Sequence, residues 1–152
     1  MRITLLAVGK IRNTPEAALV DTYVSRLPWP TNIVEVEERR PIKGPERQSR
    51  EGQLLLKAIP KGAFVIALDE RGKSLRSEAF ADKIRQWQDM GYEQLVFMIG
   101  GADGFSQEIR ERADLHISLS QMTWPHMMVR AMLAEQLYRA STIISGHPYH
   151  KD

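Results

Sequence analysis

The sequence has 152 residues, no cysteine and a formal net charge of +2. This length suits one domain with its own core, so we expect residues 1–152 to form a single domain. The lack of cysteine excludes disulfides and thiolate zinc sites, and no apolar run approaches the roughly 18 residues that span a bilayer. We therefore expect a cytoplasmic protein without a membrane segment.

Apolar runs and helix breakers divide the first part of the chain into alternating strands and helices. A buried strand is predicted at residues 3–8, and a half-exposed strand that alternates apolar and acidic residues is predicted at residues 33–37. Helices are predicted at residues 15–26, where Thr14 is a suitable N-cap, and at residues 46–59.

The same alternation continues to the end of the chain. Strands are predicted at residues 64–69, 95–99 and 115–119, with a turn at residues 70–73. Helices are predicted at residues 77–90 and 106–113, and from Pro125 to the stop signal at Gly146. Because apolar strands alternate with helices, the pattern predicts an α/β fold with a mostly parallel sheet flanked by helices.

Three loops at the predicted carboxyl ends of strands carry polar or glycine residues, and parallel sheets bind ligands at that end. They are residues 69–72, residues 100–104 with three glycines, and residues 121–124. The glycine spacing matches neither the dinucleotide fingerprint nor a P-loop. A tight turn and a ligand-binding loop both remain open for residues 100–104.

A basic cluster lies within twelve residues and comprises Arg39, Arg40, Lys43, Arg47 and Arg50. A solvated loop and a surface that attracts phosphates are both consistent with this cluster.

The last helix and the tail after it are chemically dense. The helix is apolar over much of its circumference, which favours burial on several sides, including contact with a second subunit. His126 and Arg130 lie near its first turn, and the tail holds His147, Tyr149 and His150. No second set of spaced ligands accompanies the histidines, so we expect no metal site. The tail suits nucleotide recognition, although a solvated C-terminus fits as well.

The order of five motifs resembles the bacterial ribosomal RNA large subunit methyltransferase H family, within the SPOUT superfamily of knotted methyltransferases. The motifs are LLAVGK, ALDERGK, FMIGGADGFS, LSQMTWPHMMVRAMLAEQLYRA and the terminal GHPYHKD. They span nearly the whole chain. The tail after the long helix is the most specific of them, whereas residues 28–50 are the least diagnostic.

The resemblance implies an α/β domain whose C-terminal part forms a trefoil knot. The implied activity is transfer of a methyl group from S-adenosylmethionine to N3 of a pseudouridine in 23S rRNA. The implied substrate is the assembled ribosome, and the implied active form is a homodimer joined largely through the final helices.

The resemblance also implies roles for particular residues. Cofactor contacts are expected at Leu68, Gly100, Gly101, Leu119, Ser120, Gln121, Met122, Thr123 and Trp124. Catalytic candidates, for removal of the N3 proton or stabilisation of the resulting anion, are His126, Arg130 and His150. Substrate contacts are expected from Tyr149, His150, Lys151, Arg39 and Arg40. The alternatives are a non-catalytic ribosome- or RNA-binding module and a flavodoxin-like protein that binds a small ligand.

Overall fold

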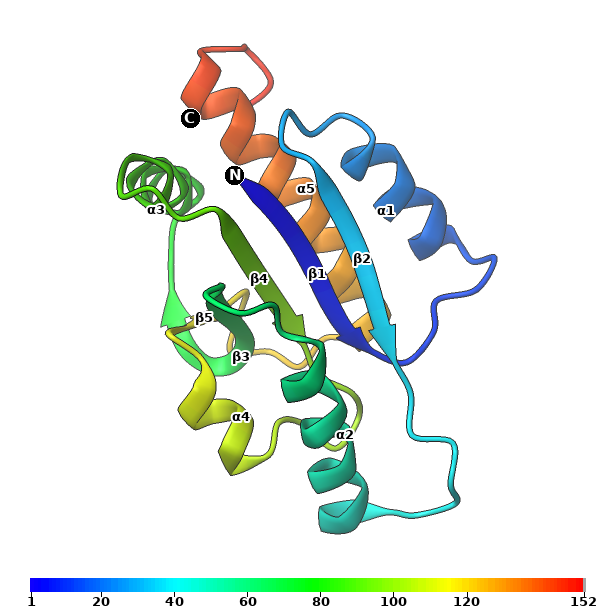
Figure 1. The fold of residues 1–152 in the computed structure, drawn as a ribbon. Helices are drawn as coiled ribbons and strands as arrows, with labels where there is room; N and C mark the ends of the chain where they lie inside the picture. The colour runs from blue at the N-terminus through cyan, green and yellow to red at the C-terminus, as the bar shows by residue number, and fades with distance from the viewer. Residues whose placement is uncertain (152) are drawn as a thin grey trace.

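The computed structural model describes residues 1–151, so Asp152 at the end of the GHPYHKD motif lies outside the described residues. Five strands form one sheet in the order β2-β1-β4-β3-β5, and every neighbouring pair is parallel (Figure 1). The strands are β1 (Arg2–Val8), β2 (Thr31–Val36), β3 (Phe64–Ser74), β4 (Gln94–Ile99) and β5 (Leu115–Ser118). The predicted α/β fold with a parallel sheet is confirmed.

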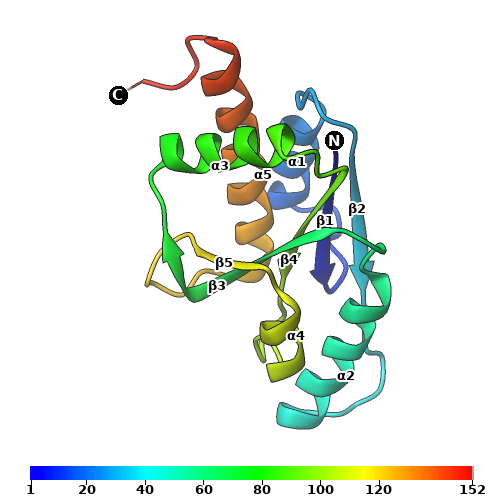
Figure 2. The ribbon, with the colours of Figure 1, turned by 60° about the vertical axis from the view of Figure 1, so that its left-hand side comes forward.

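Helices cover both faces of the sheet, as Figures 1 and 2 show. They are α1 (Pro15–Val24), α2 (Gly44–Ala58), α3 (Ser77–Asp89), α4 (Gln107–Arg112) and α5 (His126–Ser145). Since successive strand residues point to opposite faces, Leu5 and Leu6 enter different cores. Leu5 packs in the core that contains α3 and α5, and Leu6 packs with Leu55 of α2 and Ile109 of α4.

Strand β3 continues past the point where a turn was predicted. Residues 70–73 belong to the strand, so that prediction is wrong. The pairing with β5 shifts its register there, because Leu68 and Lys73 both pair with Ile117. Gly72 permits this irregular pairing, since a Cβ on it would lie 2.7 Å from the carbonyl carbon of His116. The glycine thus serves a close approach of two backbones.

Helix α5 is the central helix on its side of the sheet. It packs against both α1 and α3, and its buried residues include Leu133, Ala134 and Leu137. Burial on several sides was predicted from its apolar circumference. Gly146 ends the helix with φ of 79°, and the N–H of His147 donates to the carbonyl of Thr142 at 2.9 Å. The first turn of α5 lies at the carboxyl end of the sheet, where the strands open into loops (Figure 1).

Candidate functional site

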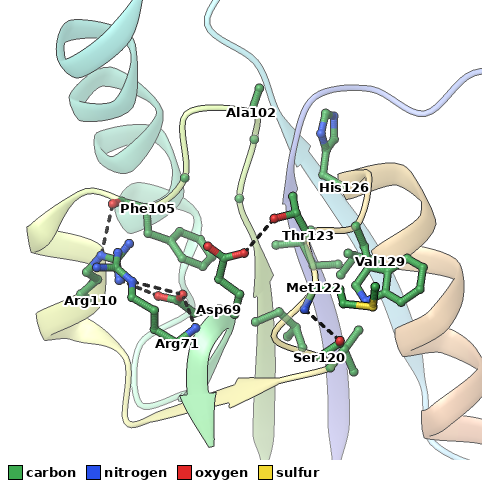
Figure 3. Close-up of a pocket in the computed structure, with 18 residues that line it drawn as sticks. Asp69, Arg71, Ala102, Phe105, Arg110, Ser120, Met122, Thr123, His126 and Val129 are labelled. Carbon is green, nitrogen blue, oxygen red and sulfur yellow. Dashed lines mark hydrogen bonds and ion pairs between the residues drawn. The ribbon is translucent and has the colours of Figure 1, made fainter. Parts of the chain in front are cut away.

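A cavity of about 470 Å³ lies at the carboxyl end of the sheet. This is where open parallel sheets hold their ligands, and small-molecule sites occupy about 300–1,000 Å³. Its walls come from the end of β3, the loop after β4, helix α4, and the segment from the β5–α5 loop into α5 (Figure 3). The lining residues are Leu68, Asp69, Glu70, Arg71, Ile99, Gly100, Gly101, Ala102, Gly104, Phe105, Arg110, Leu119, Ser120, Met122, Thr123, Trp124, His126 and Val129.

The loop after β4 needs glycine for steric and conformational reasons. A Cβ on Gly101 would lie 2.9 Å from Cγ1 of Val8. Gly104 has φ of 74°, and its N–H donates to the carbonyl of Gly101 at 3.1 Å. Gln48 of α2 donates to the carbonyl of Asp103 at 2.8 Å. The segment is therefore a tight turn fixed against α2, and it also forms one wall of the cavity.

The loop between β5 and α5 is ordered by hydroxyl groups. The N–H of Met122 donates to Oγ of Ser120 at 3.0 Å. Oγ1 of Thr123 donates to Oε2 of Glu70 at 3.2 Å, which joins this loop to the end of β3 (Figure 3). Met122 is 70% exposed and Trp124 38% exposed, so large apolar side chains lie open beside the cavity.

Most of the residues predicted to bind a cofactor come together around this cavity. Those that line it are Leu68, Gly100, Gly101, Leu119, Ser120, Met122, Thr123 and Trp124. Gln121 is exposed and is not among the lining residues. Their role in binding stays a prediction.

One wall of the cavity is charged; its Asp69 and Arg71 belong to the segment 69–72 that the sequence placed at a ligand-binding strand end, whereas Arg110 was not predicted. Nη1 of Arg110 donates to Oδ2 of Asp69 at 2.6 Å, and its Nε donates to the carbonyl of Phe105 at 3.4 Å. The N–H of Arg71 donates to Oδ1 of Asp69 at 3.0 Å. Asp69 and Arg71 directly follow an apolar run, which is a usable signal. No sequence signal marks Arg110, because it lies in a short, highly charged helix whose side chains would all be expected to face solvent.

His126 lines the cavity from the first turn of α5 (Figure 3). Burial lowers the pKa of its imidazole below the usual value, and the positive charge of Arg130 lowers this pKa further. The imidazole is therefore uncharged at neutral pH, and its unprotonated nitrogen can accept a proton.

Arg130 lies in the core, with its side chain only 2% exposed. Its Nη1 pairs with Oε2 of Glu35 at 2.5 Å, and its Nη2 donates to the carbonyls of Val8 at 3.0 Å and Gly9 at 2.6 Å. Oε2 of Glu35 also accepts the N–H of Ile11 at 2.7 Å. Burial opposes the ionised carboxylate, but these bonds hold the pKa of Glu35 below its usual range. Arg130 thus ties α5 to the ends of β1 and β2 and is not among the lining residues.

The C-terminal tail packs against helices of its own chain. The hydroxyl of Tyr149 donates to Oε1 of Glu135 at 2.9 Å, and the guanidinium of Arg139 lies 4.9 Å from the centre of the Tyr149 ring. His150 contacts Arg139 through Nδ1 at 3.0 Å and Glu78 through Nε2 at 3.1 Å. Burial, followed by hydrogen bonding, raises the pKa of Tyr149, so its hydroxyl stays protonated.

This tail and the cavity lie at opposite ends of the sheet. Figure 1 places the C-terminus near the amino end of β1, whereas the cavity is at the carboxyl ends of the strands. Within one chain, Tyr149, His150 and Lys151 are therefore not brought together with His126.

The predicted basic cluster is partly neutralised. Arg40 pairs with Glu38 at 2.9 Å, and Arg50 approaches the same carboxylate at 3.5 Å. Arg40 lowers the pKa of Glu38 to about 2, chiefly through hydrogen bonds. Arg39 and Lys43 are exposed and have no ion-pair partner among residues 1–151. The free positive charge thus lies on part of the cluster only.

No group of three or more His, Cys, Asp or Glu side chains within residues 1–151 is placed to hold a metal ion. None of the helices in this part of the chain combines the length and the apolar character needed to cross a membrane.

Comparison with known proteins gives consistent matches over the whole chain. A family model described as "Predicted SPOUT methyltransferase" matches residues 1–150. A protein of Paramagnetospirillum magneticum is 52% identical over 151 residues, covering 99% of both chains. Proteins of Rhodospirillum centenum and Rhodospirillum rubrum are 51% and 50% identical, again over 99% of both chains. All three relatives are named "Ribosomal RNA large subunit methyltransferase H".

Proposed function

Because the chain belongs to the SPOUT methyltransferase family, we propose that it transfers a methyl group from S-adenosylmethionine to N3 of a pseudouridine in 23S rRNA. The names of its relatives support the coarser statement, methylation of large-subunit ribosomal RNA. The donor, the methylated atom and the assembled ribosome as substrate are our proposal. The observation that carries it is the cavity at the carboxyl end of the sheet, lined by most of the residues expected to bind this donor.

The residues of the cavity fit a donor that combines a purine with a sulfonium ion. Gly100 and Gly101 line the cavity with backbone and carry no side chain that would occupy it. Met122 and Trp124 offer exposed apolar surface for a purine ring. Glu70 lines the cavity without an ion-pair partner among residues 1–151, so its carboxylate favours a positive charge there, whereas Asp69 is neutralised by Arg110.

His126 is our candidate for removal of the N3 proton. S-adenosylmethionine, when bound, supplies a methyl group activated by a positively charged sulfur. The imide nitrogen N3 carries a proton at neutral pH, so a base has to accept that proton for N3 to attack. His126 lines the cavity and has a lowered pKa, which makes its imidazole available as that base.

Arg130 acts, in this proposal, through the residues it holds. It fixes the first turn of α5 against Gly9 and Glu35, and its charge disfavours protonation of His126. Holding the base in place matters because misplacement by about 1 Å can reduce a rate about hundredfold. A direct role in stabilising the N3 anion stays a prediction for Arg130.

We further propose that the active form is a homodimer. Met128 of α5 and Leu19 of α1 are 38% and 46% exposed on helices that pack together, which leaves apolar surface for a second copy. The tail of each chain is far from its own cavity. A partner in a suitable orientation would bring its tail, with the predicted contributions of Tyr149, His150 and Lys151, over that cavity.

RNA binding through the basic cluster is the last part of the proposal. Arg39 is exposed without an ion-pair partner in the described chain, whereas Arg40 is paired with Glu38. An unpaired cation that neutralises a phosphate releases a counterion from the RNA, whereas a cation already paired with a carboxylate contributes less. We therefore expect Arg39 to contribute more to RNA affinity than Arg40.

The decisive experiment incubates ribosomes that lack this modification with the protein and isotopically labelled S-adenosylmethionine, followed by mass spectrometric mapping of 23S rRNA. One labelled methyl group on a pseudouridine is expected. Isolated 23S rRNA and separate subunits serve as matched substrates, and S-adenosylhomocysteine serves as the inhibited control. Binding of ribosomes without label transfer would support the RNA-binding module instead.

A further inference from the structure

The cavity has two sides of unlike chemistry. Leu119, Met122, Trp124 and Val129 line it on the side of the β5–α5 loop and α5. Asp69, Arg71 and Arg110 line the other side, where β3 faces α4, and Figure 3 shows these three charged side chains gathered away from Met122 and Val129. A ligand that fills the cavity therefore meets apolar surface at one end and fixed charges at the other.

Arg110 is held in a defined position. Its neighbour Ile109 is fully buried, which anchors helix α4 to the sheet. Its guanidinium donates to Asp69 at 2.6 Å and to the carbonyl of Phe105 at 3.4 Å. The side chain is still 24% exposed, and its Nη2 has no hydrogen-bond partner among residues 1–151. A preorganised cation with free donors thus faces the cavity.

Asp69 is built to hold this arginine. Its side chain is only 7% exposed, and its two oxygens accept from the N–H of Arg71 and from Arg110. Arg71 is a poorer anion ligand, because its side chain is 69% exposed and approaches Asp69 only at 3.8 Å. Ordering an exposed arginine side chain on a ligand costs conformational entropy, whereas Arg110 is already fixed by Asp69 and Phe105.

We propose that Arg110, held by Asp69, binds the α-carboxylate at the amino-acid end of S-adenosylmethionine and makes the site selective for ligands that carry this end. The inference rests on the proposed methyl donor. That donor has an apolar purine at one end and a carboxylate at the other, which matches the two sides of the cavity. The planar guanidinium suits a carboxylate because it presents parallel donors to its two oxygens.

Calorimetric binding of two adenosine ligands tests this role without measuring catalysis. S-adenosylhomocysteine carries the amino-acid end, whereas 5′-methylthioadenosine lacks it. Loss of a charged hydrogen bond weakens binding roughly tenfold or more. Arg110→Met is therefore expected to lower the affinity for S-adenosylhomocysteine by at least that factor and to leave the affinity for methylthioadenosine unchanged. Arg110→Lys, which keeps the charge without the planar fork, should fall between the wild type and Arg110→Met.

Two further variants separate this role from a structural one. Arg112→Met is the matched control, because Arg112 lies on the same helix, pairs with Asp114 at 3.3 Å and does not line the cavity. It should bind both ligands like the wild type. Asp69→Asn combined with Arg110→Met removes the carboxylate that the single variant would leave unpaired, and it should show the same selective loss.

The outcomes distinguish the inference from the proposed function. A wild-type protein that binds neither ligand would overturn both. Equal affinities of the wild type for the two ligands, or an equal loss of both in Arg110→Met, would overturn only the assignment of Arg110. Weaker RNA binding by Arg110→Met with unchanged S-adenosylhomocysteine affinity would also overturn it, since the cation would then contact phosphate.

Discussion

Arg130 and Arg110 each pair with a carboxylate near the carboxyl end of the sheet, in very different surroundings. Arg130 is 2% exposed and donates to Glu35 and to the carbonyls of Val8 and Gly9. Arg110 is 24% exposed, contacts Asp69 and faces a cavity. An arginine–carboxylate pair therefore joins segments of the fold in one place and leaves donors facing a cavity in the other, where we propose that they bind a ligand.

Replacing Arg130 should have the largest effect and tests whether its role is structural. Arg130→Met is expected to lower the free energy of unfolding by about 3 kcal/mol, because it leaves Glu35 and two backbone carbonyls without their partner. This is the lower end for a buried pair, since Glu35 is 25% exposed. Urea denaturation at neutral pH measures it. Arg85→Met, which breaks an exposed pair with Asp82, should cost less than about 1 kcal/mol. Similar losses of stability in Arg130→Met and Arg85→Met would contradict a structural role for Arg130.

His126 lies between the two regions, since it lines the cavity and feels the charge of Arg130. His126→Gln is expected to reduce single-turnover methyl transfer about hundredfold. In the wild type, the rate should fall only below the usual histidine pKa of 6.5, because the folded pKa is lowered. Arg130→Met should move this acid limb to higher pH, while Arg110→Met should leave it in place. A wild-type rate of methyl transfer in His126→Gln would show that His126 is not the base.

His126 also predicts how stability depends on pH. An unfolded histidine binds a proton more readily than His126 in the folded state, because its folded pKa is lowered. Its contribution is therefore complete above about pH 6.5 and is lost as the pH falls through the folded pKa. His126→Gln should flatten the stability of the protein between pH 7 and pH 5 (about the range over which histidine titrates).

Arg110→Met provides the counterpart to the Arg130 variant. Arg110→Met leaves the 7% exposed carboxylate of Asp69 without its cation, although the N–H of Arg71 still donates to it, so the expected loss of stability is about 2 kcal/mol. Bound S-adenosylhomocysteine should raise the melting temperature of the wild type, because a ligand that binds only the folded state stabilises it. At the same ligand concentration this rise should be smaller in Arg110→Met. Thermal unfolding with and without ligand measures both effects, and an unchanged rise would contradict the proposed contact.

Replacing Glu51 should have the smallest effect on stability. Its contact with Arg47 is weaker than the other two arginine–carboxylate pairs. Its side chain is 6% exposed, Arg47 approaches only at 3.5 Å, and its Oε1 has no partner among residues 1–151. Burial raises the pKa of Glu51, so the folded state loses stability as the pH rises above the usual 4.5. Glu51→Gln should therefore stabilise the protein by about 1 kcal/mol at pH 7 and much less near pH 4. A loss of stability at pH 7 would show that the contact with Arg47 dominates.

The sequence was sufficient for the fold class because apolar strands and amphipathic helices have distinct periods. It misled at Gly72, since a glycine after a strand signals a turn and a close backbone approach equally well. Gly72 serves a close approach because β3 pairs with β5 at this point, and the sequence does not show which strands are neighbours. Glu38, by contrast, stands two residues before Arg40 in the sequence, so the partial neutralisation of the basic cluster was open to prediction.

The candidate site was predictable where binding depends on loops that directly follow strands. Gly100 and Ser120 could be found in this way. Arg110 could not, because only the packing of α4 against the end of β3 turns it toward Asp69. The distance between the tail and the cavity was open to prediction, because the predicted ligand loop precedes the 20-residue α5 and the tail follows it, and a helix rises about 1.5 Å per residue.

The residues that line the cavity lie far apart in the sequence, from Leu68 to Val129, so the cavity is complete only late in synthesis of the chain. Leu68 and Gly100 are made before the β5–α5 loop and Val129, and all of them line the same space. A nascent or truncated chain that ends before residue 119 lacks one wall and the whole of α5. Mass action by a ligand can stabilise only molecules that contain the complete site. A ligand of this cavity, such as the proposed S-adenosylmethionine, can therefore stabilise only chains that extend beyond Val129.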